Sequence, residues 1–557
     1  MLEELLRLIY PKHDISALID RVEKLKTEYA SKISKERFSL TERDVVLITY
    51  GDQLNGEEQN RLTTLHSFLD KYIKHCINSI HLLPFYPYTS DDGFSVVNYT
   101  QVNPDIGTWN DIQNMAKDYH LMFDAVINHM SQKSDWFQGY LNDQPDFKQY
   151  FIDADPSDDW SKVIRPRTSP LLHAFSSKSK QTKNIWTTFS QDQVDLNYSN
   201  PDVLISILAV LLEYIDKGAI LLRLDAIGFL FKKPGTTCIH LEETHAIIKV
   251  IRLVIKDLAP QVVLVSETNV PHKENMSYFG NGTDEAHMVY NFTLPPLLAY
   301  SILKGSTQTF SKWTKSLSLP SEETCFINFT ASHDGIGVRP LTGILPEEEG
   351  KLLIEAAVAN GGLISYRSMP NGNKSPYEIN CNYLSLLFGK EKSEKLAIKR
   401  MILAQAVMLS FPGVPSFYFH SLFGSTNDIE GVSKTGMNRS INREKLDVDT
   451  LENELDEENG LRATIFNELK NMIQCRIMQK AFSPTASFKV LDMEEGLFVL
   501  QRTAALNEQK ILCIYNFTSE ERKITFPDGA FNELLSNEIV SGEIELNSYE
   551  FKWLVYS

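Results

Sequence analysis

The sequence has no surplus of positive charge. Its 55 lysines and arginines are outnumbered by 72 aspartates and glutamates, which gives a formal net charge of −17. Without a basic surplus to neutralise phosphates, binding to nucleic acid is not expected. An anionic membrane surface would repel the same acidic chain, so no membrane partner is expected either.

Paired cysteines and long apolar runs are also missing. The six cysteines lie far apart, without a CxxC pair or a Cys/His cluster at metal spacing. We therefore expect no zinc site and interpret them as small buried side chains in a reducing compartment. No stretch approaches the roughly 20 apolar residues of a membrane span. The N-terminal residues include Glu3 and Glu4, which do not fit a signal peptide. Together these features predict a cytoplasmic protein.

The sequence does contain a series of short apolar runs rich in β-branched residues, the pattern of buried parallel strands. Helix-like segments, such as residues 204–215 and 245–256, separate many of these runs. Eight strands that alternate with helices predict an α/β fold with a closed (β/α)8 barrel, the TIM barrel. The polar residues that follow several runs would then meet at the catalytic end of the barrel. The predicted strands are residues 45–50, 79–85, 121–127, 219–224, 261–266, 288–292, 325–329 and 407–411.

Other parts of the chain do not fit a plain barrel. The first residues show helical spacing, and two long polar intervals are typical of inserted substrate-binding domains or lids. The end of the chain alternates apolar and polar residues, which predicts short antiparallel strands. We predict an N-terminal helical extension (1–44), a catalytic barrel in three parts (45–129, 201–334 and 398–475), inserted domains B (130–200) and B′ (335–397), and a C-terminal antiparallel β domain (476–557).

An aspartate within an apolar run is the first candidate catalytic residue. Asp225 lies in the run LRLDAIG, where burying its charge costs several kcal/mol unless the carboxylate is paired. Arg223 lies two residues earlier and shares a face with Asp225 on an extended strand. The arginine can therefore keep Asp225 ionised and oriented, as a nucleophile requires. A buried salt bridge with a purely structural role is the alternative.

Two more carboxylates follow predicted strands. Glu267 ends the run VLVSET with no cation beside it, a setting that raises a carboxyl pKa as a general acid requires. Asp334 lies in SHDGIG, where His333 could donate to a sugar hydroxyl and where a turn-capping aspartate is the alternative. Carboxylates at the ends of three barrel strands point to glycoside chemistry, in which a pair of carboxylates flanks the glycosidic bond.

These segments resemble the α-amylase superfamily, glycoside hydrolase family 13, and within it the sucrose phosphorylase-like branch. The matching segments are DAVINHMS (124–131), RLDAIG (223–228), SETN (266–269) and HDGIG (333–337). The resemblance implies a retaining mechanism with Asp225 as nucleophile, Glu267 as acid/base and Asp334 as the carboxylate that stabilises the transition state. It implies no metal and no cofactor, with inorganic phosphate as co-substrate. The glucose-binding residues that it implies are Asp91, Phe94, His129, Arg223, His333 and Arg443.

Finer features indicate a phosphorylase. Arg165 and Arg167 flank a proline in a turn that resembles a loop supplying arginine to phosphate or acceptor, and guanidinium groups suit both anions. A solvated basic turn is the alternative. The segment SPYEIN (375–380), with Tyr377 and Glu378, resembles the loop that alternates between acceptor and phosphate in sucrose phosphorylases.

The chain departs from sucrose phosphorylases at Phe229, Asn269 and Glu378, where those enzymes carry tyrosine, histidine and glutamine. The segments GFSVVNY, EETHAIIKVIR and ETNVPHKEN resemble instead the glucosylglycerate phosphorylase subgroup. Those enzymes reversibly convert an α-glucoside of glycerate and phosphate into α-glucose 1-phosphate and glycerate. The resemblance implies small-molecule partners, an α-glucoside and phosphate. It also implies an acceptor carboxylate bound by Arg165, Arg167 or Lys374, with Asn269, Tyr377 and Glu378 on the same side.

Three alternatives stay open on the sequence. One is a phosphorylase for sucrose, sucrose 6′-phosphate or glucosylglycerol. Another is an α-glucosidase or transglucosidase that uses the same carboxylates with water or a sugar as acceptor. The third is an inactive barrel that serves as a binding protein, although members of that kind lose one or more of the three carboxylates, all of which this chain has.

Overall fold

The computed structural model describes residues 1–34, 38–56, 60–368 and 373–556. At its centre, eight parallel strands close a barrel, each hydrogen-bonded to the next in chain order and the last to the first. Almost every strand residue is buried, because side chains fill the barrel and helices cover its outer face. The barrel strands are β1 (Val46–Thr49), β3 (Ser79–Leu82), β4 (His120–Ala125), β9 (Ala219–Leu224), β10 (Val263–Ser266), β11 (Met288–Tyr290), β12 (Cys325–Phe329) and β16 (Val414–Tyr418).

The eighth strand differs from the prediction. Residues 407–411, predicted as a strand, belong instead to the end of helix α13 (Glu394–Ser410) and to Phe411 just after it. This half of α13 is buried on all sides, so its apolar run lacks the polar face that marks a surface helix. The eighth strand is β16, with the sequence VPSFY. Its proline and serine interrupt the run of β-branched residues that marks the other buried strands.

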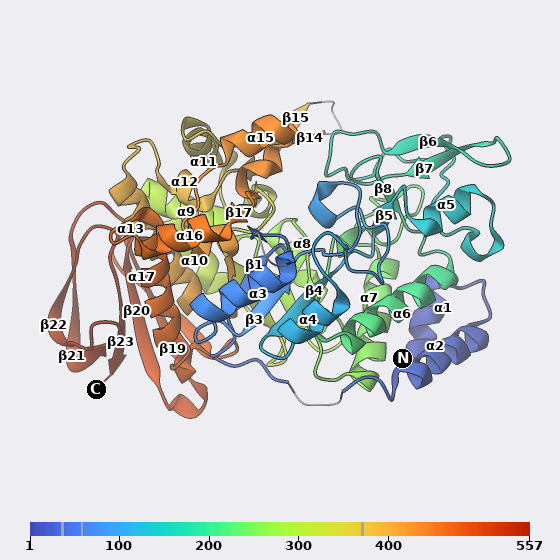
Figure 1. The fold of residues 1–557 in the computed structure, drawn as a ribbon. Coiled ribbons are helices and arrows are strands. Elements are labelled where there is room, and N and C mark those ends of the chain that lie inside the picture. The colour runs from blue at the N-terminus through green and yellow to red at the C-terminus, as the bar shows by residue number, and fades with distance from the viewer. Residues whose placement is uncertain (35–37, 57–59, 369–372, 557) are drawn as a thin grey trace.

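Helices connect the strands and form the outer layer of the barrel (Figure 1). Helix α6 shows how the sequence sets a helix start: the Asn200 side chain accepts a hydrogen bond from the Asp202 backbone N–H at 3.0 Å, and Pro201 occupies the first turn. The helices that follow barrel strands or lie beside them include α3 (Arg61–Tyr72), α4 (Trp109–Met115), α6 (Pro201–Asp216), α7 (Glu242–Leu258), α8 (His272–Met276), α9 (Leu294–Lys304), α10 (Gln308–Ser316), α13, α14 (Phe419–Leu422) and α17 (Leu461–Arg476).

The N-terminal residues form helices α1 (Leu2–Ile9) and α2 (Ile15–Tyr29), which pack against α6 and α7 (Figure 1). Their apolar faces are buried there, and two ion pairs secure the edges. Lys26 lies 2.8 Å from Asp257, and Arg21 lies 2.8 Å from Asp202. The predicted helical extension therefore covers the barrel on the side away from the C-terminal sheet (Figure 1).

Two groups of elements interrupt the barrel. Between β4 and β9 lie the short pair β5–β8, a hairpin β6–β7 and a helix; after β12 lies a three-stranded sheet in the order β13-β15-β14 with helix α11. The limits of domains B and B′ stay predictions. The first group is β5 (His129–Ser131), α5 (Asp135–Leu141), β6 (Leu172–Ser176), β7 (Thr182–Trp186) and β8 (Gln193–Asp195); the second is β13 (Ile336–Gly337), α11 (Glu347–Ala359), β14 (Leu363–Ser368), β15 (Lys374–Asn380) and α12 (Tyr383–Leu387).

The end of the chain forms an antiparallel sheet in the order β18-β19-β20-β23-β21-β22, drawn in red at the left of Figure 1. Its inner face packs on α10 and α13. Before it, a small parallel pair β2–β17 and two helices complete the fold. These elements are β2 (Leu54–Asn55), α15 (Ile429–Thr435), β17 (Leu446–Asp447), α16 (Val448–Asp456), β18 (Ser487–Leu491), β19 (Leu497–Thr503), β20 (Lys510–Asn516), β21 (Arg522–Glu533), β22 (Ile539–Leu546) and β23 (Phe551–Tyr556).

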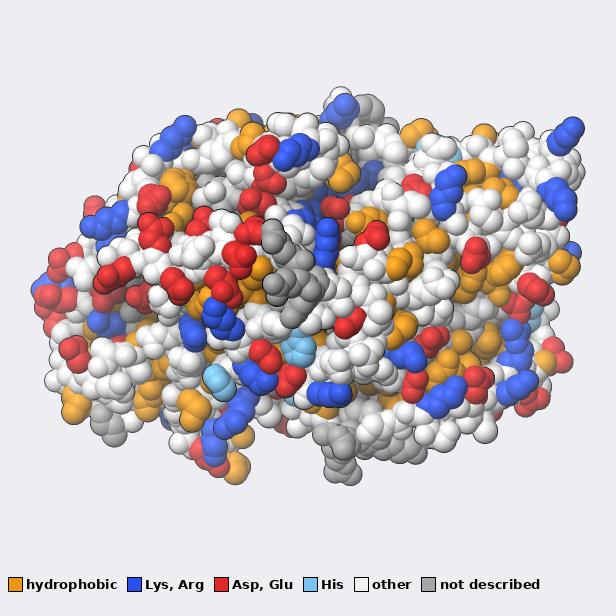
Figure 2. All heavy atoms as spheres, viewed as in Figure 1, with side chains coloured by type: hydrophobic (Ala, Val, Ile, Leu, Met, Phe, Trp, Pro, Cys, Tyr) orange, Lys and Arg blue, Asp and Glu red, His pale blue; other side chains and the backbone are white. Residues whose placement is uncertain are grey.

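The surface carries mixed charge. Acidic and basic side chains are interspersed over the face shown in Figure 2, with acidic ones in excess, as the net charge of −17 requires. Among the described residues, no helix is both long and apolar enough to span a bilayer.

Candidate active site

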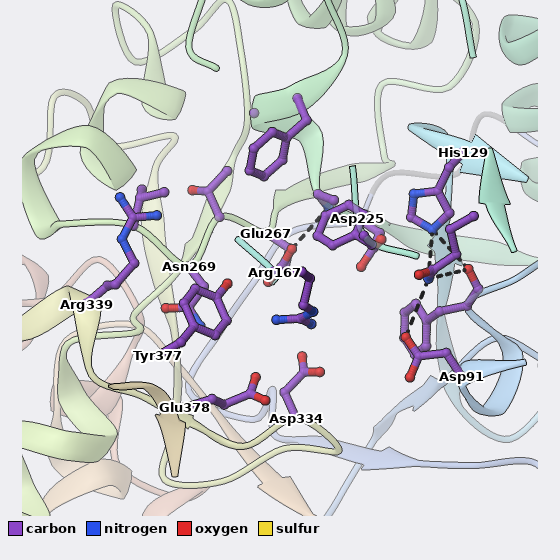
Figure 3. Close-up of a pocket in the computed structure, with 18 of the residues that line it drawn as sticks. Asp91, His129, Arg167, Asp225, Glu267, Asn269, Asp334, Arg339, Tyr377 and Glu378 are labelled. Atoms are coloured by element: carbon purple, nitrogen blue, oxygen red, sulfur yellow. Dashed lines mark hydrogen bonds between the residues drawn. The ribbon is translucent and has the colours of Figure 1, made fainter. Parts of the chain in front are cut away.

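A cavity with an empty volume of about 710 Å³, including the solvent-filled space at its mouth, opens at the carboxyl ends of the barrel strands. Most of the predicted site residues line it (Figure 3). Arg223 and Arg443 are buried against its lining, whereas Arg165 and Lys374 are not among the lining residues. The predicted residues that line the cavity are Asp91, Phe94, His129, Arg167, Asp225, Glu267, Asn269, His333, Asp334, Tyr377 and Glu378.

Asp225 follows strand β9 directly and is held by Arg223. The Arg223 Nη1 atom lies 2.9 Å from Asp225 Oδ1, as the shared strand face predicts. The same guanidinium also pairs with Asp124 near the end of β4. The Asp124 carboxylate in turn accepts a hydrogen bond from His81 at 2.7 Å. The chain then turns through Ala226, whose positive φ of 50° aims its N–H into the cavity.

Glu267 reaches the same cavity from the neighbouring strand. Strand β10 pairs with β9 so that Ser266 lies beside Leu224, which places residues 225 and 267 at equivalent ends of adjacent strands. The Ala226 N–H donates to Glu267 Oε2 at 3.0 Å and fixes the carboxylate. The Arg223 guanidinium is farther from Glu267, at 4.0 Å, than from Asp225.

Burial dominates the protonation of this pair. It raises the pKa of Asp225 well above its ordinary value; the Arg223 guanidinium opposes that rise, and the negative charge of Glu267 adds to it. Burial likewise raises the pKa of Glu267, again opposed by Arg223. The Arg223 guanidinium favours the ionised form of Asp225, in the direction that the sequence predicts, while burial and the charge of Glu267 oppose it. Because their charges interact, the two carboxyls titrate as a pair that can hold one proton between them.

The pKa of Asp334 is shifted in the opposite direction. Burial disfavours its charge, but the guanidinium of Arg439, 2.7 Å away, lowers the pKa of Asp334 below its ordinary value with help from neighbouring cations. Arg439 was not predicted. It lies one helical turn before Arg443 in the segment NRSINR, and it also donates to both oxygens of Glu378, at 2.7 and 3.1 Å.

Residues on one side of the carboxylates form what we call the inner end of the cavity: Asp91, Phe94, His129, His333 and Asp334. The Phe94 and His333 rings stack with centroids 4.7 Å apart, and His129 Nε2 lies 2.9 Å from the Phe94 carbonyl oxygen. Burial lowers the pKa of His333 to about 3, so this imidazole is neutral at neutral pH.

Arg443 contacts residues of the inner end and holds them in place. Its Nε donates to the His333 carbonyl at 2.8 Å, and its Nη1 lies 2.7 Å from Asp92 and 3.4 Å from Asp91. Asp91 and Asp92 both adopt positive φ, at 53° and 47°, in the short 3-10 turn that follows β3. These contacts hold the inner end in one arrangement.

The opposite side, which we call the outer end, comprises Arg167, Asn269, Arg339, Tyr377 and Glu378. Figure 3 shows Arg167 projecting between Tyr377 and the carboxylates. Its guanidinium lies 5.2 Å from the centre of the Tyr377 ring. Arg339, which was not predicted, enters from the turn after β13. Among the described residues, neither Arg167 nor Arg339 has a carboxylate within 4.0 Å.

Arg165 does not reach the outer end. Its guanidinium donates to the Ser169 carbonyl oxygen in its own turn. Lys374 is an exposed residue at the start of β15. Of the three cations predicted for an acceptor carboxylate, only Arg167 lines the cavity. The same surface also includes Gln193, which was not predicted, and two phenylalanines, Phe189 and Phe229.

One cluster of potential metal ligands lies away from the cavity. His66, Asp70 and Asp118 gather beside helices α3 and α4. The Lys74 ammonium lies 3.0 Å from both Asp70 and Asp118, so a cation of the protein already occupies the space between the carboxylates. This cluster is therefore a surface ion-pair network in the part of the chain that the structure describes.

Residues 52–339 match the family model described as "Alpha amylase, catalytic domain". The chain is 43% identical to "Glucosylglycerate phosphorylase" of Escherichia coli (strain K12), an alignment that covers 97% of this chain and 96% of the relative. It is also 43% identical to the protein of the same name from Spirochaeta thermophila, over 95% of this chain and 92% of the relative. Its fold is similar to the crystal structure of sucrose 6F-phosphate phosphorylase from Thermoanaerobacter thermosaccharolyticum, with a TM-score of 0.77, 25% identity and coverage of 91% and 99%.

Proposed function

The chain belongs to the α-amylase family, and from that premise we propose that it is a retaining phosphorylase of 2-O-α-glucosylglycerate. The products are α-glucose 1-phosphate and glycerate, and inorganic phosphate is the co-substrate. The observation that carries the substrate assignment is the 43% identity, over nearly the full length of both chains, to proteins named for this activity. The likeness to the sucrose 6F-phosphate enzyme is weaker, at 25%.

The inner end of the cavity suits the glucosyl group. The stacked rings of Phe94 and His333 offer an aromatic surface, and the carboxylates of Asp91 and Asp334 in the same lining offer hydrogen-bond acceptors for ring hydroxyls. The neutral His129 and His333 can donate or accept. Because ion pairs already fix Asp334 and Arg443, little reorganisation accompanies binding.

In the first half of the reaction, Asp225 attacks the anomeric carbon from the β face, opposite the glycerate oxygen, and Glu267 donates its proton to that departing oxygen. We assign the shared proton to Glu267, because Asp225 lies 2.9 Å from the Arg223 guanidinium and Glu267 lies 4.0 Å away. The closer cation favours the charged carboxylate. A β-glucosyl-enzyme results, with the bond from carbon to glycerate oxygen broken.

In the second half, phosphate replaces glycerate at the outer end. Glu267, now ionised, accepts a proton from hydrogen phosphate while a phosphate oxygen attacks the anomeric carbon and releases Asp225. Two inversions give net retention. Arg167 supports this step, since it lines the cavity and has no carboxylate within 4.0 Å among the residues that the structure describes. A guanidinium binds phosphate or carboxylate through paired hydrogen bonds.

A second candidate function is hydrolysis or transglucosylation on the same glucosyl-enzyme. The cations at the outer end favour an anionic acceptor over water or a neutral sugar. An acceptor screen in the synthetic direction tests the assignment. The enzyme receives α-glucose 1-phosphate with glycerate, glycerol, fructose or fructose 6-phosphate, and phosphate release is followed. We expect glycerate to give the fastest release; a faster rate with another acceptor would reassign the substrate, and equal release without any acceptor would indicate a hydrolase.

A further inference from the structure

A second cavity lies against the outer end of the active-site cavity. Its empty volume is about 1770 Å³, and it is bounded by α11, the turn after β13 and the β14–β15 hairpin. Apolar residues such as Leu341, Leu345 and Ile354 form part of its wall. Arg339 lines both cavities and so forms part of the partition between them.

Two arginines, Arg339 and Arg367, line this second cavity. Arg339 is nine-tenths buried, with 9% of its surface exposed, and Arg367 on β14 has a buried Nε that makes no hydrogen bond. In the part of the chain that the structure describes, neither guanidinium has a carboxylate within 4.0 Å. The acidic residue on the wall, Glu347, is exposed and pairs with neither.

The two guanidinium groups also lie close enough to repel each other. Burial lowers the pKa of Arg367, and the positive charge of Arg339 lowers it further. Two fully buried arginines of this chain, Arg476 and Arg502, instead donate hydrogen bonds to backbone carbonyl oxygens. Arg476 donates to the carbonyl oxygens of Leu409 and Phe482, and Arg502 donates to that of Ser410.

Two neighbouring cations, one buried and one half-buried, are unfavourable without a counter-charge unless an anion joins them. We propose that Arg339 and Arg367 form a second anion-binding site, in the cavity next to the active site, that takes a small oxyanion such as inorganic phosphate or a carboxylate. Two guanidinium groups can bind one such anion through paired, charge-assisted hydrogen bonds. This identity of the anion rests on the proposed function, in which phosphate and glycerate exchange at the adjoining outer end.

The position of Arg339 gives the site a role. An anion held between Arg339 and Arg367 lies one side chain away from the acceptor end of the active site. Phosphate bound there stays beside the outer end while glycerate leaves. Its binding raises the local concentration of phosphate near the glucosyl-enzyme, for which phosphate is the acceptor.

Calorimetric titration of the full chain tests the site directly, in a chloride buffer without other oxyanions. Inorganic phosphate and sodium glycerate are titrated separately into the wild-type chain and the Arg367→Gln and Arg367→Lys variants. Arg7→Gln, which removes an exposed arginine on α1, is the matched control. Arg367 does not line the active-site cavity, so its loss leaves direct contacts with the glucosyl group intact.

We expect Arg367→Gln to weaken binding of one of the two anions at least tenfold, Arg367→Lys to weaken it less, and the control to bind as wild type. Selective loss of phosphate binding identifies the co-substrate as the ligand, and selective loss of glycerate binding identifies the carboxylate. Unchanged affinity for both anions in a folded Arg367→Gln variant overturns the proposal. Because binding is measured without turnover, this outcome is separate from a failure of the proposed reaction.

Discussion

The arginines beside the inner end and the catalytic pair each lie against a carboxylate, whereas Arg167 and Arg339 at the outer end have none within 4.0 Å in the part of the chain that the structure describes. Arg223 pairs with Asp225, and Arg439 pairs with Asp334. Where the protein supplies both charges, they are already neutralised before any substrate binds. Where it supplies only the cation, the substrate must bring the anion. A neutral glucosyl group suits the inner end, and phosphate or glycerate suits the outer end.

Replacing the nucleophile should have the largest effect. Asp225→Asn removes the atom that bonds to the anomeric carbon, so we expect kcat for phosphorolysis to fall by about 10⁴-fold or more. Steady-state assays of α-glucose 1-phosphate release measure this. A matched thermal melt checks folding, and a folded variant with near wild-type turnover would remove Asp225 from the mechanism.

Replacing the acid should cost less and should change the pH dependence. The pKa of Glu267 is raised, and the first step needs its proton, so activity persists below that raised pKa and is lost as pH increases through it. In Glu267→Gln we expect kcat/KM for the glucoside to fall by about 10³-fold and the alkaline limb to disappear. With α-glucosyl fluoride, whose fluoride leaves without a proton, the first step should recover. An unchanged alkaline limb in the variant would assign it to another group.

Breaking one ion pair at the inner end should damage both activity and stability. Arg439→Gln leaves Asp334 and Glu378 buried without their cation, which costs about 3 kcal/mol of unfolding free energy. The pKa of Asp334 should rise, so the variant should lose activity at a higher pH than wild type as the solution is acidified. Chemical denaturation and the acid limb of kcat/KM report the two effects. Wild-type behaviour in both would mean that the charges at this end are not coupled.

Removing an unpaired cation at the outer end should have the smallest effect on the protein and a selective effect on kinetics. Arg167→Gln breaks no ion pair with any described residue, so we expect the unfolding free energy to stay within about 0.5 kcal/mol of wild type. The KM values for phosphate and glycerate should rise about tenfold, with kcat less affected. Equal loss of affinity for the neutral acceptor glycerol would contradict an anion-binding role.

The same contrast explains what could be predicted from the sequence. The apolar runs predict the barrel strands, and the acidic residues at their ends predict the three carboxylates. A residue at the end of a barrel strand is both partly buried and placed at the catalytic end of the barrel. Arg439 and Arg339 lie in turns, and nothing local shows that they reach the cavity. Arg165 and Arg167 are two residues apart in one turn, yet only the folded loop decides which points inward. The eighth strand was missed because a fully buried helix and a buried strand share the same composition.

The central claim is that phosphate, not water, receives the glucosyl group from Asp225. The most direct test incubates the enzyme with 2-O-α-glucosylglycerate, with and without inorganic phosphate, and quantifies α-glucose 1-phosphate and free glucose. We predict α-glucose 1-phosphate as the main product with phosphate present, and almost no turnover without it. Free glucose released at the same rate in both reactions would contradict the claim.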